Sequence, residues 1–366
     1  MRTRGKLARY FVFLFTVSSA IAQPYRNEDE RCVRLGAVPQ IKVLPSTTTA
    51  PADRDVEKLI ASLAGIDAPD YGLSSTLEGT IFSPIEGSAQ VSTLIFTDHG
   101  LKPNVNIRKL AMMGPAAMPA LLKALDDRTP TKLRIDRMGI CGMWYARELE
   151  SNYVHPVEKR ILRHWKHEDE GEKQRDVESH TVKVGEVCFV IVGQIVGRGY
   201  CAVRYQPSGC TVINSPIEDP IVAKALRDIW SAIEPRQALL DSLLIDFSTR
   251  GVNDAKDPEI CDAASRVQCA AAMRLLYYFP RESSELIAER LKKLDVTRTG
   301  PPSSQPANDS EMDAWLKREA KNGLRTDDFI KAVAWCREPA ITKALNAIRE
   351  RTTDEDILEA IREGRK

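Results

Sequence analysis

The sequence predicts an all-α protein, an irregular solenoid built from antiparallel helix pairs. Beyond residue 105, apolar residues recur at spacings of three and four over much of the chain, which is the period of a helix with one buried face. These stretches come in pairs, separated by short breaks that contain proline or glycine. Short helix pairs that return every few tens of residues are typical of solenoids, in which each pair packs on its neighbours.

The first 22 residues have the pattern of a signal peptide. Four basic residues precede an apolar run, FVFLFTV, and Ala20-Ile21-Ala22 fits the small-residue cleavage rule. The run is shorter than the ~20 apolar residues that a membrane span needs. We therefore expect cleavage near Ala22 and an exported protein, periplasmic or extracellular, with no membrane span in the mature chain.

The composition is that of a folded globular chain. Of 366 residues, 43% are hydrophobic and 28% are charged, with 52 Lys+Arg against 51 Asp+Glu. These values exclude wholesale disorder, collagen and a multi-pass membrane protein. Loss of the four basic residues of the signal leaves a net charge of −3. A nucleic-acid binder normally carries a basic excess or stripe, so no nucleic-acid partner is expected.

Residues 23–104 are expected to form an irregular N-terminal region with one short helix. Asp55 to Leu63 places its apolar residues on one helical face. Two brief strand-like runs, at 80–82 and 91–96, indicate either a small hairpin or a long ordered loop.

Residues 105–296 are expected to form the helical-repeat domain. Its first unit, LAMMGPAAMPALLKALDD at 110–127, resembles a HEAT-type repeat in its order of Leu, small-Gly-Pro, apolar-Pro, Leu-Leu and Asp. Looser units follow at 220–249, 267–294 and 328–350. The resemblance implies an all-α superhelix whose inner face binds something, usually another macromolecule, and it implies no particular reaction.

Two segments interrupt the helical pattern. Residues 166–183 are highly charged and are expected to be a solvated loop or frayed helix end, and 297–310 have the Pro/Ser/Gly composition of a linker to a C-terminal helical cap at 311–366. Residues 184–196 are apolar and rich in β-branched side chains. A helix is favoured for 184–196, although a buried strand of that length is equally allowed.

The candidate binding site is a predicted loop at 197–216 that follows this apolar element. Loops dense in Arg, Tyr, Gln and Asn supply adaptable hydrogen-bonding groups on a rigid scaffold, and an Arg fork can hold a carboxylate or phosphate. The alternative is a well-ordered connector whose polar side chains satisfy helix-end carbonyls. The proposed contacts are Arg198, Tyr200, Arg204, Tyr205, Gln206 and Asn214.

Other chemistry-bearing residues give weaker signals. His164 and His167 share a helix face, as two metal ligands must, but no third ligand is placed by spacing, so neither a metal nor a cofactor is expected. His155 and His180 have no partner visible in the sequence. Cys201 and Cys210 flank a short Pro/Gly-containing segment and are the best disulfide candidates.

Two further features bear on catalysis. Trp144 and Tyr145 are a candidate aromatic surface for a ligand to stack on, although such a pair more commonly packs in the core. No GxSxG, SxxK or Walker-type motif occurs.

Taken together, these patterns predict an exported binding or scaffold module with a protein or other macromolecular partner. The alternative is an enzyme of unknown reaction, with a pocket formed by the solenoid and residues 197–216.

Overall fold

The computed structural model describes most of the chain after residue 32. The described ranges are 33–45, 53–85, 89–92, 100–137, 142–158, 177–206, 209–251, 262–297 and 309–365. The signal-peptide prediction for 1–22 and nearly all of the predicted linker lie outside them. Over the described ranges the chain is mostly helical, as predicted, with short strands between the helices. None of the helices there is both long and apolar enough to cross a membrane.

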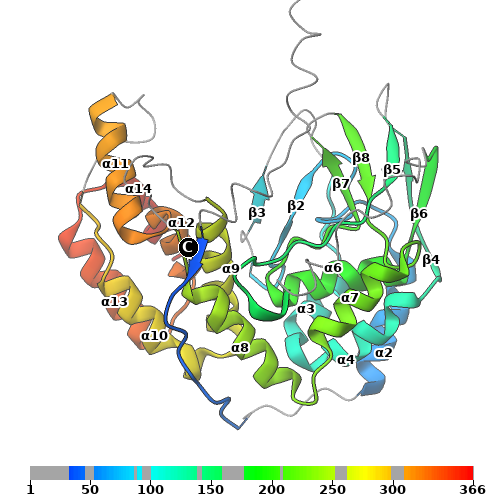
Figure 1. Cartoon of the computed structure of the whole chain (residues 1–366), viewed down its shortest axis with the longest axis horizontal. Helices are drawn as coiled ribbons and strands as arrows, with labels where there is room; N and C mark the ends of the chain where they lie inside the picture. Colours follow the sequence, from blue (N-terminus) through cyan, green and yellow to red (C-terminus); the bar gives the residue numbers. More distant parts are fainter. Residues whose placement is uncertain are drawn as a thin grey trace, which may run out of the picture.

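The first half of the molecule is organised around one buried helix, α6 (Val184–Val196). The segment 184–196, for which a buried strand was the alternative, is therefore a helix. Every residue of α6 is buried, which explains a sequence that is apolar on all sides. Four other helices, α2 (Asp53–Ser62), α3 (Val105–Met113), α4 (Met118–Lys123) and α7 (Pro220–Trp230), lie with it beneath the strands (Figure 1). Of these, α3 and α4 pack directly against α6.

The chain is mostly helical rather than all-α, because within the described ranges short strands form four small sheets. One is the hairpin of β2 (Glu78–Ile81) and β3 (Ala89–Ser92). Another pairs β4 (Pro130–Asp136) with β6 (Ser179–Lys183), and part of the segment predicted to be a charged loop or frayed helix end is therefore a strand. A third joins β5 (Met143–Tyr145), β8 (Cys210–Ile213) and β7 (Val203–Gln206), with β5 parallel and β7 antiparallel to β8. The last pairs β1 (Val33–Leu35) with β9 (Thr249–Gly251).

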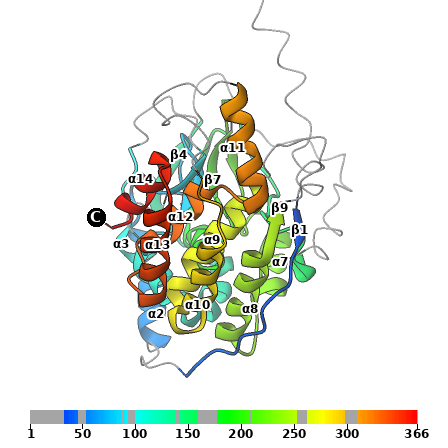
Figure 2. The ribbon, with the colours of Figure 1, turned by 90° about the vertical axis from the view of Figure 1, so that its left-hand side faces the viewer.

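The second half of the described chain consists mainly of helices packed side by side (Figures 1 and 2). They are α8 (Pro235–Ser248), α9 (Asp262–Tyr278), α10 (Pro280–Lys292), α11 (Asp309–Asn322), α12 (Thr326–Ala334), α13 (Pro339–Arg351) and α14 (Glu355–Glu363). Helix α9 packs on α8 and α12, α12 packs on α14, and α10 packs on α13.

Proline sets where several of these helices begin. Pro220, Pro235, Pro280 and Pro339 each stand at the first position of a helix. A proline there costs no hydrogen bond because the first-turn N–H groups lack intrahelical acceptors. The sequence breaks at 280 and 339 are therefore the starts of the following helices.

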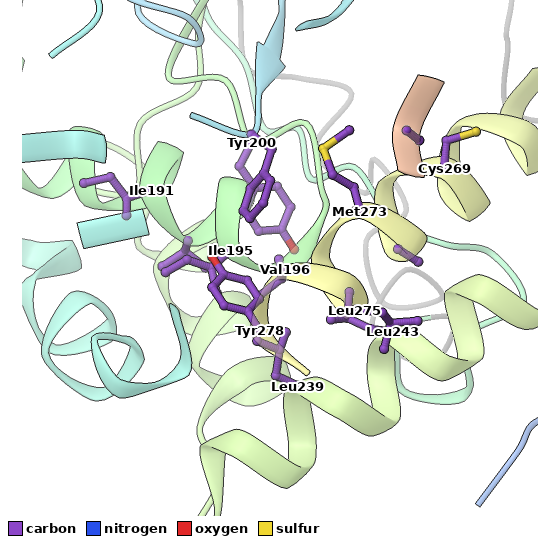
Figure 3. Close-up of a cluster of buried hydrophobic side chains, with 14 of the residues drawn as sticks. Ile191, Ile195, Val196, Tyr200, Leu239, Leu243, Cys269, Met273, Leu275 and Tyr278 are labelled. Carbon is purple, nitrogen blue, oxygen red and sulfur yellow. The ribbon is translucent and has the colours of Figure 1, made fainter. Parts of the chain in front are cut away.

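The core runs continuously through both halves. Figure 3 shows Ile195 and Val196 of α6 beside Tyr278 of α9, in one buried cluster with Leu239 and Leu243 of α8. Beside this contact lies Arg274, which is almost fully buried. Its Nε donates to the carbonyl of Gln194 at 2.7 Å near the end of α6, where helix carbonyls carry partial negative charge. Helix α6 thus joins the strand-bearing half to the helical half.

Candidate functional site

The six predicted contact residues lie on the connection after α6, on β7 and, for Asn214, just after β8. The prediction that 197–216 is a loop is wrong where β7 and β8 form, at 203–206 and 210–213. Val203, Arg204, Tyr205 and Gln206 pair in register with Ile213, Val212, Thr211 and Cys210. Arg204, Tyr205 and Gln206 are therefore held by strand pairing, whereas Arg198, Tyr200 and Asn214 lie outside the strands.

Arg198 is buried in an ion cluster and is not exposed to a ligand. Its Nη2 donates to Glu158 at 2.6 Å and its Nη1 donates to Asp246 at 2.7 Å. Asn152 completes the cluster, donating its side-chain amide to Asp246 and its backbone N–H to Glu158. Burial disfavours the charge of Arg198, but the two carboxylates outweigh that effect and raise its pKa well above the ordinary value. We therefore conclude that Arg198 stabilises the fold and does not contact a ligand.

Tyr200 and Asn214 are also structural. The Tyr200 ring stacks on Phe189 of α6 with 5.0 Å between centroids, and its hydroxyl accepts a hydrogen bond from Trp230. Burial raises the pKa of Tyr200 above its ordinary range. The Asn214 side chain accepts from the backbone N–H of Glu148 at 3.1 Å and donates to the carbonyl of the same residue. Both side chains are therefore committed to partners within the chain.

Arg204 lies in a partly exposed charged group that we call the carboxylate platform, consisting of Glu78, Glu148 and Arg204. The guanidinium donates to both carboxylate oxygens of Glu148, at 2.9 and 2.7 Å, and lies 3.7 Å from Glu78. The side chain of Arg204 is 15% exposed, against 38% for Glu78 and 41% for Glu148. The carboxylates therefore form the outer part of the platform, and one partly buried guanidinium contacts both of them.

The platform carries an excess of negative charge. Glu150 is exposed nearby and accepts a hydrogen bond from the backbone N–H of Gly199. Partial burial raises the pKa of Glu78 above its ordinary value, and the attraction of Arg204 opposes this rise. Tyr205 and Gln206, which lie next along β7, are partly exposed.

Tyr145, His180 and Glu186 form a hydrogen-bonded chain that the sequence did not predict and that we call the proton chain. His180 Nε2 lies 2.9 Å from Glu186 Oε2, and His180 Nδ1 lies 3.2 Å from the Tyr145 hydroxyl. His180 and Glu186 are buried, whereas Tyr145 is partly exposed. Glu186 also accepts the backbone N–H of Lys183 at 2.8 Å, which caps α6. The three residues come from β5, β6 and α6, so no sequence spacing brings them together.

The predicted Cys201–Cys210 disulfide is not formed, because the Cys201 thiol is free and buried. Cys201 precedes β7, whereas Cys210 is the first residue of β8, so the two lie at opposite ends of the β7–β8 pairing. Burial raises the pKa of Cys201 to about 12. A thiol in that state is a poor nucleophile at neutral pH.

The weak metal candidates His164 and His167 lie outside the described residues. Within the described ranges, no group of three or more His, Cys, Asp or Glu side chains is placed to hold a metal ion.

No family model, curated protein or solved structure matches the chain.

Proposed function

We propose that the chain is an exported HEAT-like repeat protein that acts as a binding or scaffold module, with the carboxylate platform as its contact surface. The partner is a protein segment that carries lysine or arginine side chains. The observation that carries the proposal is the geometry of Glu78 and Glu148, which both face one guanidinium and remain about two-fifths exposed.

The platform has the physical properties of a contact surface. The Glu148 carboxylate is held by a bidentate contact to Arg204, so this side chain loses little conformational freedom when a partner binds. Two carboxylates and one guanidinium give the platform itself a net charge of −1, and among the described residues Arg266 adds a further attraction to Glu78. Complementary charge speeds association and selects among partners, and the effect weakens with salt.

The packing of the second half supports the repeat part of the proposal. Helices α9, α12 and α14 contact one another in succession, while α10 contacts α13 beside them. Pairs α9–α10 and α12–α13 thus lie side by side, as successive repeats of a solenoid do. A solenoid is a rigid support for a contact surface, which is the role that we propose for it.

A peptide-binding experiment tests the proposed partner chemistry. Fluorescent peptides of equal length, one rich in lysine and one rich in glutamate, are titrated with the mature protein and with Glu78→Gln/Glu148→Gln. We expect the lysine peptide to bind, and the double substitution to weaken it by at least about fivefold, the loss of roughly 1 kcal/mol of partly exposed charge pairing.

A matched control lies at the far end of the chain. Arg362 is also flanked by two carboxylates, Glu355 at 3.8 Å and Glu359 at 3.3 Å. Glu355→Gln/Glu359→Gln removes the same charge from the protein and is expected to leave peptide binding within twofold of wild type. Equal weakening by both double variants would show that net charge, not the platform, attracts the peptide.

The proton chain favours a second candidate function, an enzyme that uses acid–base chemistry. A carboxylate that orients a histidine, which in turn contacts a hydroxyl, is the arrangement used to activate a nucleophile. Here the hydroxyl is that of Tyr145, at 3.2 Å from His180. Turnover of p-nitrophenyl acetate that is lost in Tyr145→Phe and in His180→Asn would support this function. Rates equal to the buffer background in wild type would count against it.

A further inference from the structure

An extended N-terminal segment lies across the helical half of the molecule. We call this segment, residues 33–45, the strap. It begins as β1, paired with β9, and continues along α8 (Figure 2). Its last residues reach Arg281 and Glu282 at the beginning of α10. The strap therefore spans the surface formed by β9, α8 and the start of α10.

The contacts that hold the strap are made mainly to its main chain. The N–H of Gly36 donates to the carbonyl of Ser248 at 2.9 Å, and the N–H of Leu44 donates to Glu282 at 3.0 Å. Arg281 donates to the carbonyl of Pro45 at 3.5 Å. Main-chain groups are common to all residues, so these contacts do not depend on the side chains of the strap.

Gln237 of α8 contacts the strap as a neighbouring strand would. Its Nε2 donates to the carbonyl of Ile41 at 3.0 Å, and its Oε1 accepts the N–H of Val43 at 2.9 Å. A residue in a parallel strand makes the same two bonds on either side of its partner. Asp241 accepts from the same Nε2 at 2.8 Å and holds the amide in this orientation.

The side chains of the strap add a modest apolar contribution. Val38, Ile41 and Val43 are partly buried against the core, while Lys42 between them is exposed. The surface thus accepts an extended segment with aliphatic residues at these positions and places no demand on the residues between them.

We propose that this surface also binds the strap of a second copy of the chain, so that two copies exchange residues 33–45. The strap is the segment whose fit to the surface is seen, and each copy carries both the strap and its acceptor. Exchange of an identical element keeps every contact within the fold, which makes it a low-cost route to a dimer. The proposal does not depend on the carboxylate platform.

The bound strap of the same chain is the main competitor of a second copy. A tethered segment acts at an effective concentration in the millimolar range, so the acceptor surface must first be emptied. A protease site inserted between residues 45 and 53, cut after folding, converts the strap into a separate peptide that is free to dissociate. This cut protein is the recipient in the experiment.

The donor is the full-length chain with Gln237→Ala, labelled with a fluorophore, whose own acceptor surface is weakened. We expect donor and recipient to form a 1:1 complex by size-exclusion chromatography with light scattering, and free 33–45 peptide to displace the donor. Introducing Val38→Asp/Ile41→Asp into the donor strap should abolish the complex. Replacing the exposed Lys42 by Ala should leave it within about twofold of the parent, because solvated side chains contribute little at interfaces.

Two results would overturn the proposal. If the recipient binds the free peptide but not the donor chain, the surface binds extended segments and a second copy is not their source. If it binds neither, while circular dichroism shows that the cut protein remains folded, the surface does not bind the strap in trans. A peptide N-methylated at Val43 tests the main-chain contact directly and should bind about fivefold more weakly, the loss of one hydrogen bond.

Discussion

Replacing Arg198 by methionine removes the cation from a buried ion cluster and should destabilise the protein strongly. The guanidinium makes four hydrogen bonds of 2.6–3.1 Å to Glu158 and Asp246. The side chains of all three residues are at most 2% exposed. Without Arg198, two carboxylates remain buried with no cation between them.

The expected loss follows from that geometry. Removing one partner of a buried pair costs about 3–5 kcal/mol, because the remaining charge is left uncompensated. Here two carboxylates are left facing each other, so the upper part of the range applies. Asn152 still donates to both, which keeps the loss from exceeding it.

Urea unfolding of Arg198→Met against wild type, followed by circular dichroism at pH 7.5, measures this loss. The triple variant Arg198→Met/Glu158→Gln/Asp246→Asn is the control, since neutral amides need no cation, and it should recover at least half of the stability. The carboxylates of the single variant bind protons more tightly in the folded than in the unfolded state, so its stability relative to wild type should rise as the pH falls from 7.5 to 5. A loss below about 1 kcal/mol, the value typical of a surface pair, would refute the reasoning.

Three other predictions test the packing and the buried titratable groups. In Gly185→Ala the new Cβ would lie 2.4 Å from the carbonyl oxygen of Leu125, so we expect a loss of about 2 kcal/mol or more in urea unfolding, whereas Gly65→Ala, which meets nothing within 4 Å, should be neutral. Burial lowers the pKa of His155, so on acidification the unfolded state takes up this proton at a higher pH than the folded state, and the free energy of unfolding should fall below about pH 6.5. His155→Gln should remove this part of the loss, measured by unfolding curves at pH 7 and 5.5. An unchanged pH dependence in the variant would contradict the burial of His155. Burial raises the pKa of Cys201 to about 12, so labelling followed by peptide mass spectrometry should modify this thiol at pH 8 only in urea; rapid labelling of the native protein would contradict its burial.

Helices could be predicted from the sequence where one continuous pattern determines them. The run at 184–196 is apolar on every side because α6 is buried on every side. Strands β1, β5, β6 and β9 gave weaker signals, because they have three to five residues and pair with segments far away in the sequence. Strand β4 is the exception that could have been found: Thr131, Leu133 and Ile135 alternate with exposed residues, which is the period of a half-buried strand.

The candidate site, like the fold, could be predicted from the sequence only in part. The sequence pointed to the polar density at 197–216, and Arg204 does lie in a partly exposed charged group. It did not reveal that Arg198 is buried, because its partners Glu158 and Asp246 are 40 and 48 residues away. His180 and Glu186 belong to a strand and to the following helix, so neither the period of two nor that of 3.6 relates them.

The central claim is that the carboxylate platform holds a protein partner. The most direct measurement is affinity purification of the tagged mature protein from its native exported fraction, with quantitative mass spectrometry. Wild type, Glu78→Gln/Glu148→Gln and the control Glu355→Gln/Glu359→Gln are compared in parallel. The claim predicts a stoichiometric partner with wild type and the control, at least fivefold depleted with the platform variant. A partner retained equally by all three proteins would contradict it.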